Sequence, residues 1–222
     1  MVSWRKGYTF TDDEAEADIA VVNSCCFIGD AKEESINTIL QLAEWKTEGQ
    51  LKALIVCGCL AQRYKDEIQT EIPEVDAIIG TTAIDTIVET VDSVLAGKSE
   101  NHLEDIDRAC VYGVPRSVTT GGHFAYLKIA EGCNKRCTYC VIPSVRGNYR
   151  SIPMDSLVRR GKKTGGKRCE GTDLSRTGDH CLRVIDLYGE KMLPELLRKL
   201  CTIEGLVWIR LLYCYPEEIR KS

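Results

Sequence analysis

The sequence predicts an α/β protein whose first part is a parallel sheet covered by helices. Apolar, strand-like runs alternate with segments of helical spacing along the first hundred residues, which is the order of a sheet built from strand–helix–strand units. Apolar residues make up 44% of the 222, enough for a packed core. We expect buried strands at 18–23, 51–56 and 75–79, each followed by a helix, at 30–45, 62–72 and 84–95.

The ends and faces of these helices follow from particular residues. In the first helix, Ile36, Ile39, Leu40 and Ala43 recur at helical spacing, so we expect them to form its buried face. Pro73 ends the second helix.

A polar, irregular stretch divides the chain in two. We expect one domain over 1–98, a linker over 99–120 and a second domain over 121–222. The second domain should begin with a strand at 125–130, and it should end with a helix at 193–201 and a strand at 207–213.

Composition excludes several classes of protein. A net charge of −4 and a pI near 5.5 are not those of a general nucleic-acid binder. The sequence contains no apolar run of bilayer-spanning length, and its first residues carry no apolar signal core, so we expect a cytoplasmic protein. Twelve cysteines without an export signal favour metal or redox chemistry over a disulfide framework.

The most specific pattern is a triplet of cysteines, Cys133, Cys137 and Cys140, directly after the strand expected at 125–130. Three thiolates at this spacing fit one loop around a 4Fe–4S cluster and leave one iron without a protein ligand. That iron can bind the amino and carboxylate groups of S-adenosylmethionine (SAM). A zinc site is the alternative, but zinc usually takes four ligands and no second cysteine pair follows at a suitable spacing.

A second group of cysteines lies in the first domain. Cys25 and Cys59 each come just after an expected strand, and the carboxyl ends of parallel strands share one edge of a sheet. The neighbouring Cys26 and Cys57 are alternates, although they are equally well explained as small buried apolar side chains.

Three segments carry a resemblance to a known family. Residues 126–151, from Tyr126 through the cysteine triplet to Arg146-Gly147 and Ser151, resemble the radical loop of the radical SAM methylthiotransferases. Residues 22–25 and 58–63 resemble two of the three segments that hold this family's auxiliary cluster.

The resemblance implies an N-terminal parallel α/β methylthiotransferase domain followed by a radical SAM (β/α) partial barrel. It implies two 4Fe–4S clusters, one held by Cys133, Cys137 and Cys140 and bound to SAM beside Tyr139, and an auxiliary one held by Cys25 and Cys59. In this family one SAM donates a methyl group and a second provides the radical, with an electron donor such as flavodoxin or ferredoxin. The family's first auxiliary cysteine would precede residue 1 and its barrel continues past residue 222. We therefore expect a chain incomplete at both ends and inactive by itself.

The resemblance also implies a substrate. Residues 186–190 and 206–216 resemble the branch that methylthiolates an aspartate of the small-subunit ribosomal protein S-twelve, so we expect that protein or the small subunit as partner, and neither DNA nor a membrane. The branch that modifies isopentenyladenosine in tRNA is an alternative, but it usually shows Ser-x-His-Pro where this chain has Tyr213-Cys-Tyr-Pro216. An inactive fragment or a zinc-binding scaffold is a third possibility.

Residues 159–183 depart from everything around them. They carry eight basic and three acidic residues, a local charge of +5, without helical or strand periodicity. A basic insertion is one interpretation. Our hypothesis is a shifted reading frame: allowed codons read from their second base give an amphipathic helix, a buried strand and a turn, including an Ala-Gln-Glu-Thr-Thr stretch that resembles the ribosomal-protein branch. We expect the printed chain to fold poorly after residue 158.

Overall fold

The chain divides into two compact units, 1–105 and 106–222. A computed structural model describes residues 7–113, 123–165, 171–175 and 185–212. The predicted linker, 99–120, spans the division between the units, and His102 still belongs to the first unit, where it forms a parallel bridge with Ile79. No helix in the described part of the chain is long and apolar enough to cross a membrane.

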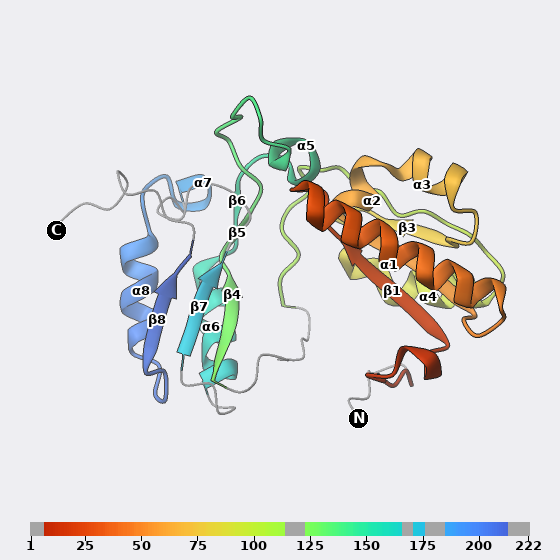
Figure 1. Cartoon of the computed structure of the whole chain (residues 1–222). Helices are drawn as coiled ribbons and strands as arrows, with labels where there is room; N and C mark the ends of the chain where they lie inside the picture. The colour runs from red at the N-terminus through yellow and green to blue at the C-terminus, as the bar shows by residue number, and fades with distance from the viewer. Residues whose placement is uncertain (1–6, 114–122, 166–170, 176–184, 213–222) are drawn as a thin grey trace. The chain divides into compact units, whose positions relative to one another are not determined.

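The first unit contains the predicted parallel sheet. Its strands are β1 (Ile19–Ser24), β2 (Ala53–Gly58) and β3 (Ala77–Ile79), in that order across the sheet and all parallel (Figure 1). The helices are α1 (Gly29–Thr47), α2 (Cys59–Arg63), α3 (Lys65–Glu71) and α4 (Ile87–Leu95), with short 3-10 turns at Glu14–Glu16 and Ile84–Thr86. The α/β class predicted for this part of the chain is therefore confirmed.

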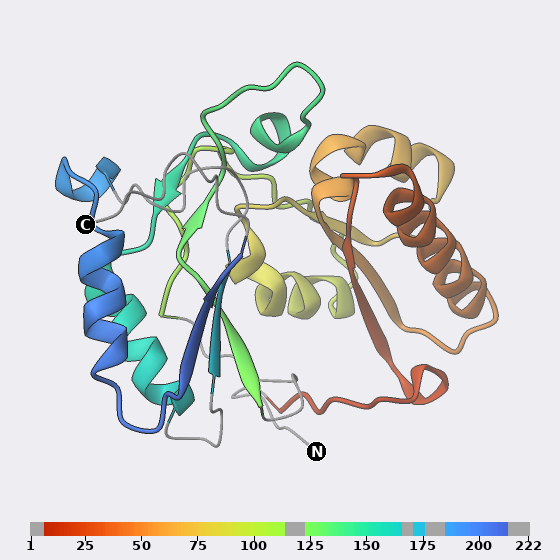
Figure 2. The same cartoon turned by 60° about the vertical axis from the view of Figure 1, so that its left-hand side comes forward.

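Helices cover both faces of this sheet. Every residue of the central strand β2 is buried, and its side chains alternate between the faces. Ile55 and Cys57 pack with Val91 of α4 in one apolar cluster. Figures 1 and 2 place α1 on the opposite face, where Ile39 and Leu42 are buried.

The predicted buried face of the first helix was partly wrong. Ile39 and Ala43 are buried as expected, but Ile36 is 36% exposed and Leu40 is 44% exposed. The buried stripe instead begins at Ser35, whose Oγ accepts a hydrogen bond from the backbone N–H of Cys25 at 2.9 Å. Turning Ser35 toward the loop after β1 carries Ile36 and Leu40 outward.

The helix predicted at 62–72 is two helices. Tyr64 has φ −120° and ψ 35°, outside the helical region, so α2 ends before it and α3 begins after it. Helix α2 starts at Cys59, three residues earlier than predicted.

The second unit is built on another three-stranded parallel sheet. Its strand order is β4 (Phe124–Lys128), β7 (Gly171–Ser175), β8 (Trp208–Leu211). A short antiparallel pair, β5 (Ala130–Glu131) and β6 (Arg150–Ser151), continues from β4. The helices are α5 (Ile142–Arg146), α6 (Met154–Gly165), α7 (Ile185–Tyr188) and α8 (Leu193–Cys201).

One apolar cluster holds this unit together. Leu127 and Ile129 from the strand side pack with Leu157 of α6 and with Leu196 and Leu200 of α8. Figure 2 shows α6 and α8 side by side against the same face of the sheet. The helix predicted at 193–201 has the bounds of α8, whereas Tyr213 of the predicted last strand lies outside the described residues.

The lack of periodicity at 159–183 predicted neither the helix nor the strand that is present where the structure describes this segment. Helix α6 continues through Gly165, and β7 is the middle strand of the sheet. Two physical reasons account for this. Gly161 permits close packing, because a Cβ there would come within 2.9 Å of Ile203 Cδ1. The pairing of β7 uses backbone groups, which every sequence without proline provides. Residues 166–170 and 176–184 lie outside the described part.

Candidate functional sites

Two loops that follow parallel strands meet at one edge of the first sheet. Ser24 and Gly58, the last residues of β1 and β2, are register partners. Cys25 and Cys59 are the residues that follow them. Two cysteines that are 34 positions apart in the sequence therefore leave the same edge, as the strand pattern predicted.

A close backbone approach fixes this edge. Gly58 has φ +98° and ψ −156°, a conformation in which a side chain is strained. A Cβ there would lie 2.5 Å from Ser24 O. The Ser24 hydroxyl donates to Cys57 O at 2.6 Å and accepts from the Ala61 N–H at 3.3 Å, so it ties the end of β1 to the start of α2.

The four cysteines near this edge fall into two pairs. Cys25 and Cys59 are partly exposed, whereas Cys26 and Cys57 are buried. The Cys26 thiol donates to Cys59 O at 3.3 Å. Burial raises the pKa of Cys26. The neighbouring Cys59 and Cys25 raise this pKa further, whereas the positive charge of Arg63 lowers it. The pair named as ligands from the sequence is thus the more accessible one.

Gln62 joins the third strand to the same edge, a role that sequence reasoning missed. Its side-chain oxygen accepts hydrogen bonds from the Thr81 N–H at 3.1 Å and the Thr81 hydroxyl at 3.4 Å. That oxygen occupies the place that a Cβ on Gly80 would take. The only available signal was the position of Gln62 three residues after Cys59.

The second site is the loop that carries the cysteine triplet, which begins directly after β5. The Cys133 N–H donates to Gly147 O at 3.0 Å and closes the base of the loop. Gly132 has φ +73°, and a Cβ there would lie 2.6 Å from Gly147 O. The Asn134 side chain accepts from the Tyr149 N–H at 2.9 Å. We call residues 132–140 the cysteine loop. Segment 147–149 therefore holds the start of the cysteine loop.

The three cysteines of this loop differ in exposure. Cys133 is buried, Cys137 and Cys140 are partly exposed, and Tyr139 is 89% exposed. The Cys140 N–H donates to Cys137 O at 3.0 Å, which makes a tight turn between them. Among the described residues no three His, Cys, Asp or Glu side chains form a ready metal-binding group. The donor set itself, three thiols within eight residues of one loop, has the chemistry that a cubane cluster requires.

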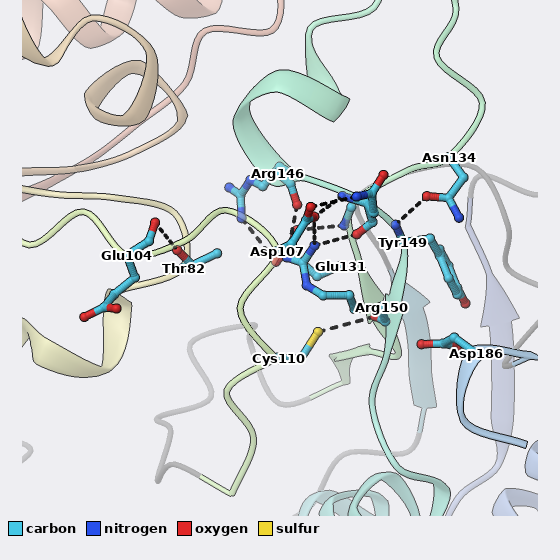
Figure 3. Close-up of polar contacts among 12 residues, drawn as sticks. Thr82, Glu104, Asp107, Cys110, Glu131, Asn134, Arg146, Tyr149, Arg150 and Asp186 are labelled. Atoms are coloured by element: carbon cyan, nitrogen blue, oxygen red, sulfur yellow. Dashed lines mark hydrogen bonds and ion pairs between the residues drawn. The ribbon is translucent and has the colours of Figure 1, made fainter.

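An ion-pair network lies beside Cys133 and was not anticipated from the sequence. Glu131 is 8% exposed and pairs with Lys128. It also pairs with Arg146 Nη1 at 3.3 Å (Figure 3). A buried carboxylate is stable only with such partners. The network therefore connects the end of β5 with the end of α5, on either side of the cysteine loop.

Comparisons with known proteins bear on both sites. The family described as "Uncharacterized protein family UPF0004" matches residues 2–80. A protein of Lachnoclostridium phytofermentans named "Ribosomal protein uS12 methylthiotransferase RimO" is 56% identical over 96% of this chain and 48% of its own length. A protein of the same name in Clostridioides difficile is 45% identical over 98% of this chain and 49% of its own length. Another in Desulforamulus reducens is 47% identical over 94% of this chain and 47% of its own length. The chain spans about half the length of these curated relatives.

Proposed function

We propose that this chain is part of an enzyme that adds a methylthio group to an aspartate of the small-subunit ribosomal protein S-twelve. The chain belongs to the methylthiotransferase family of its RimO relatives. The observation that carries the proposal is the identity of 56% over 96% of the chain, a span long enough to include both cysteine sites. The proposed activity is a transferase reaction that uses SAM, and it belongs to the whole enzyme of which this chain matches about half.

In this proposal Cys133, Cys137 and Cys140 hold a 4Fe–4S cluster with one iron open to SAM, and Tyr139 lies beside the cofactor. When bound, that cluster supplies the electron that cleaves SAM to a radical. The donor set supports the assignment. The hydrogen bonds from Cys133 to Gly147 and from Tyr149 to Asn134 also support it, because they position one end of the cysteine loop before any metal arrives.

Cys25 and Cys59 are proposed as ligands of the second, auxiliary cluster. Their place on one sheet edge and their partial exposure support this role. Cys26 and Cys57 suit it less, because they are buried and Cys57 belongs to the core of the sheet. A third ligand would come from outside these two loops.

The domain assignment remains part of the proposal. Residues 1–98 would be the auxiliary-cluster domain and 121–222 an incomplete radical SAM core. The parallel order β4-β7-β8 with α6 and α8 on one face is compatible with a segment of a (β/α) barrel. The partners would be the ribosomal protein or small subunit and a flavodoxin or ferredoxin, in the cytoplasm.

Anaerobic reconstitution with iron and sulfide tests the radical-cluster assignment. We expect brown protein with about four irons per cluster. Cys137→Ala should lose the iron bound at the cysteine loop. The control Cys201→Ala removes an exposed cysteine of α8 and should keep it. Uptake of one zinc and no iron by the parent chain would contradict the proposal and favour the zinc scaffold.

The substrate is tested separately with the reconstituted chain. A peptide of ribosomal protein S-twelve bearing the target aspartate and a tRNA stem-loop bearing isopentenyladenosine are compared as ligands. We expect tighter binding of the peptide. A preference for the tRNA stem-loop would contradict the ribosomal substrate and leave the enzyme class intact.

A further inference from the structure

We infer that residues 106–110, the strap, set the conformation of the cysteine loop through one positioning residue, Asp107. The inference deepens the proposed function, on which it rests for the role of that loop. The strap consists of the first five residues of the second unit, and its contacts with segment 147–150 all lie within that unit.

Asp107 receives several hydrogen bonds from segment 148–150. Its Oδ1 accepts from the backbone N–H of Asn148 at 2.6 Å and pairs with Arg150 Nη1 at 3.2 Å. Its Oδ2 accepts from the Asn148 side-chain NH₂ at 2.7 Å. Figure 3 shows Asp107 pointing toward Arg150, with Cys110 on the same segment donating to Arg150 O at 3.3 Å.

The strap also packs closely on the backbone. Gly147 has φ +70°, and a Cβ there would lie 2.5 Å from Ile106 O. Only a glycine leaves room for the strap at this point. The strap and the residue that closes the base of the cysteine loop are thus in direct contact.

Asn148 passes the effect of Asp107 to the middle of the cysteine loop. Its side-chain oxygen accepts a hydrogen bond from Arg136 Nη2 at 2.9 Å. Arg136 lies between Cys133 and Cys137, and its φ of +47° is the only positive value for a residue other than glycine in the described part of the chain. A hydrogen bond to Asn148 therefore accompanies the least favourable backbone conformation of the loop.

The positioning role of Asp107 follows from a difference in hydrogen bonding: a carboxylate only accepts, whereas an amide both donates and accepts. A carboxylate can only accept, so it turns the Asn148 NH₂ toward itself and the Asn148 oxygen toward Arg136. An amide at position 107 would replace one of the two carboxylate oxygens with an NH₂. Keeping the bond from the Asn148 backbone would place that NH₂ against the NH₂ of Asn148. Relieving the clash by flipping Asn148 would leave two donors facing each other at Arg136.

The experiment exploits this donor–acceptor order in the full chain. Asp107→Asn changes almost no volume and should break the link to Arg136. Asp107→Asn combined with Asn148→Asp should restore it, because the new amide at position 107 then donates to the new carboxylate at position 148, and that carboxylate accepts from Arg136. Glu204→Gln, an exposed position in the turn after α8, removes the same charge as a control.

Hydrogen exchange of the metal-free chain is the first measurement. We expect amides of residues 132–140 to exchange about tenfold faster in Asp107→Asn, the effect of losing one charge-assisted hydrogen bond. The double variant and the Glu204→Gln control should match the parent. In reconstituted protein reduced with dithionite, the change in the cluster's electron paramagnetic resonance spectrum on adding SAM should weaken in Asp107→Asn and return in the double variant.

The outcomes separate the two proposals. Unchanged exchange in Asp107→Asn, or a double variant that exchanges as fast as the single one, overturns the positioning role. A parent chain that takes up no iron overturns the proposed function. The hydrogen-exchange result still decides whether Asp107 positions the cysteine loop. If Asp107→Asn unfolds the unit, recovery of folding and slow exchange in the double variant supports the relay, and failure to recover overturns it.

Discussion

Ser24 and Gly58 are register partners at the carboxyl ends of β1 and β2, and their backbones are so close that a Cβ on Gly58 would lie 2.5 Å from Ser24 O. This contact sets the spacing between the two loops that carry Cys25 and Cys59. The Ser24 hydroxyl reinforces it by bonding to Cys57 O. The proposed auxiliary site is therefore built on backbone packing, and its geometry depends on a residue that carries no side chain.

Substituting Gly58 should damage this edge more than substituting a glycine with similar φ in open space. We expect Gly58→Ala to lower the free energy of unfolding by about 2 kcal/mol or more, because backbone strain and the Ser24 contact act together. Gly49 has φ +83° with nothing within 4 Å of its Cβ position, so Gly49→Ala should lower it by about 1 kcal/mol. Urea unfolding followed by circular dichroism measures both. Equal losses would show that the close approach has no energetic effect.

Neighbouring residues of α1 should respond very differently to truncation. Ile39 is fully buried, so we expect Ile39→Ala to lower the free energy of unfolding by about 2–5 kcal/mol. Leu40 is 44% exposed, so Leu40→Ala should change it by about 1 kcal/mol or less. The same unfolding measurement decides between this helix face and the one expected from the sequence pattern, in which both residues were buried.

The thiol of Cys110 should alkylate slowly. Burial raises its pKa, the positive charge of Arg150 lowers it and Glu131 raises it, with a net upward shift. At pH 8 the thiolate fraction of Cys110 is therefore reduced, and its reaction with iodoacetamide should be slower than that of exposed Cys201. The Cys110 rate should rise as the pH is raised, because the thiolate is the nucleophile. Peptide mapping by mass spectrometry of the metal-free chain measures both sites, and equal rates at pH 8 would contradict the shift.

The shifted-frame hypothesis makes a prediction about β7. This middle strand has the sequence Gly-Thr-Asp-Leu-Ser, although strands inside parallel sheets are usually apolar. The second-base interpretation gives Glu-Leu-Ile-Leu-Val over the same residues, 171–175. We expect a variant in which residues 159–183 are replaced by the sequence of the shifted reading frame to have a melting temperature roughly 5 °C or more above that of the present chain.

The source DNA provides the direct check of that hypothesis. A frame change before codon 159 and its reversal after codon 183 should be present in a fresh read. A confirmed printed frame, together with equal melting temperatures, would remove the hypothesis and leave the basic segment as a genuine feature of the chain.

The sequence by itself determined the features that depend on local periodicity. Alternating strand and helix patterns identified the first parallel sheet, and apolar spacing placed α8 at its observed bounds. The position of Cys25 and Cys59 just after two strands was enough to place them at one edge, because parallel strands end on the same side.

Only the tertiary structure decided which partners those elements meet. The helical period of α1 could not show that Ser35, and not Ile36, faces the loop after β1. Asp107 and Asn148 are 41 residues apart, and no spacing rule relates them. Periodicity is a property of one segment, whereas hydrogen bonds and close packing between segments depend on how the whole chain folds. For that reason the cysteines could be named in advance, and the residues that hold their loops could not.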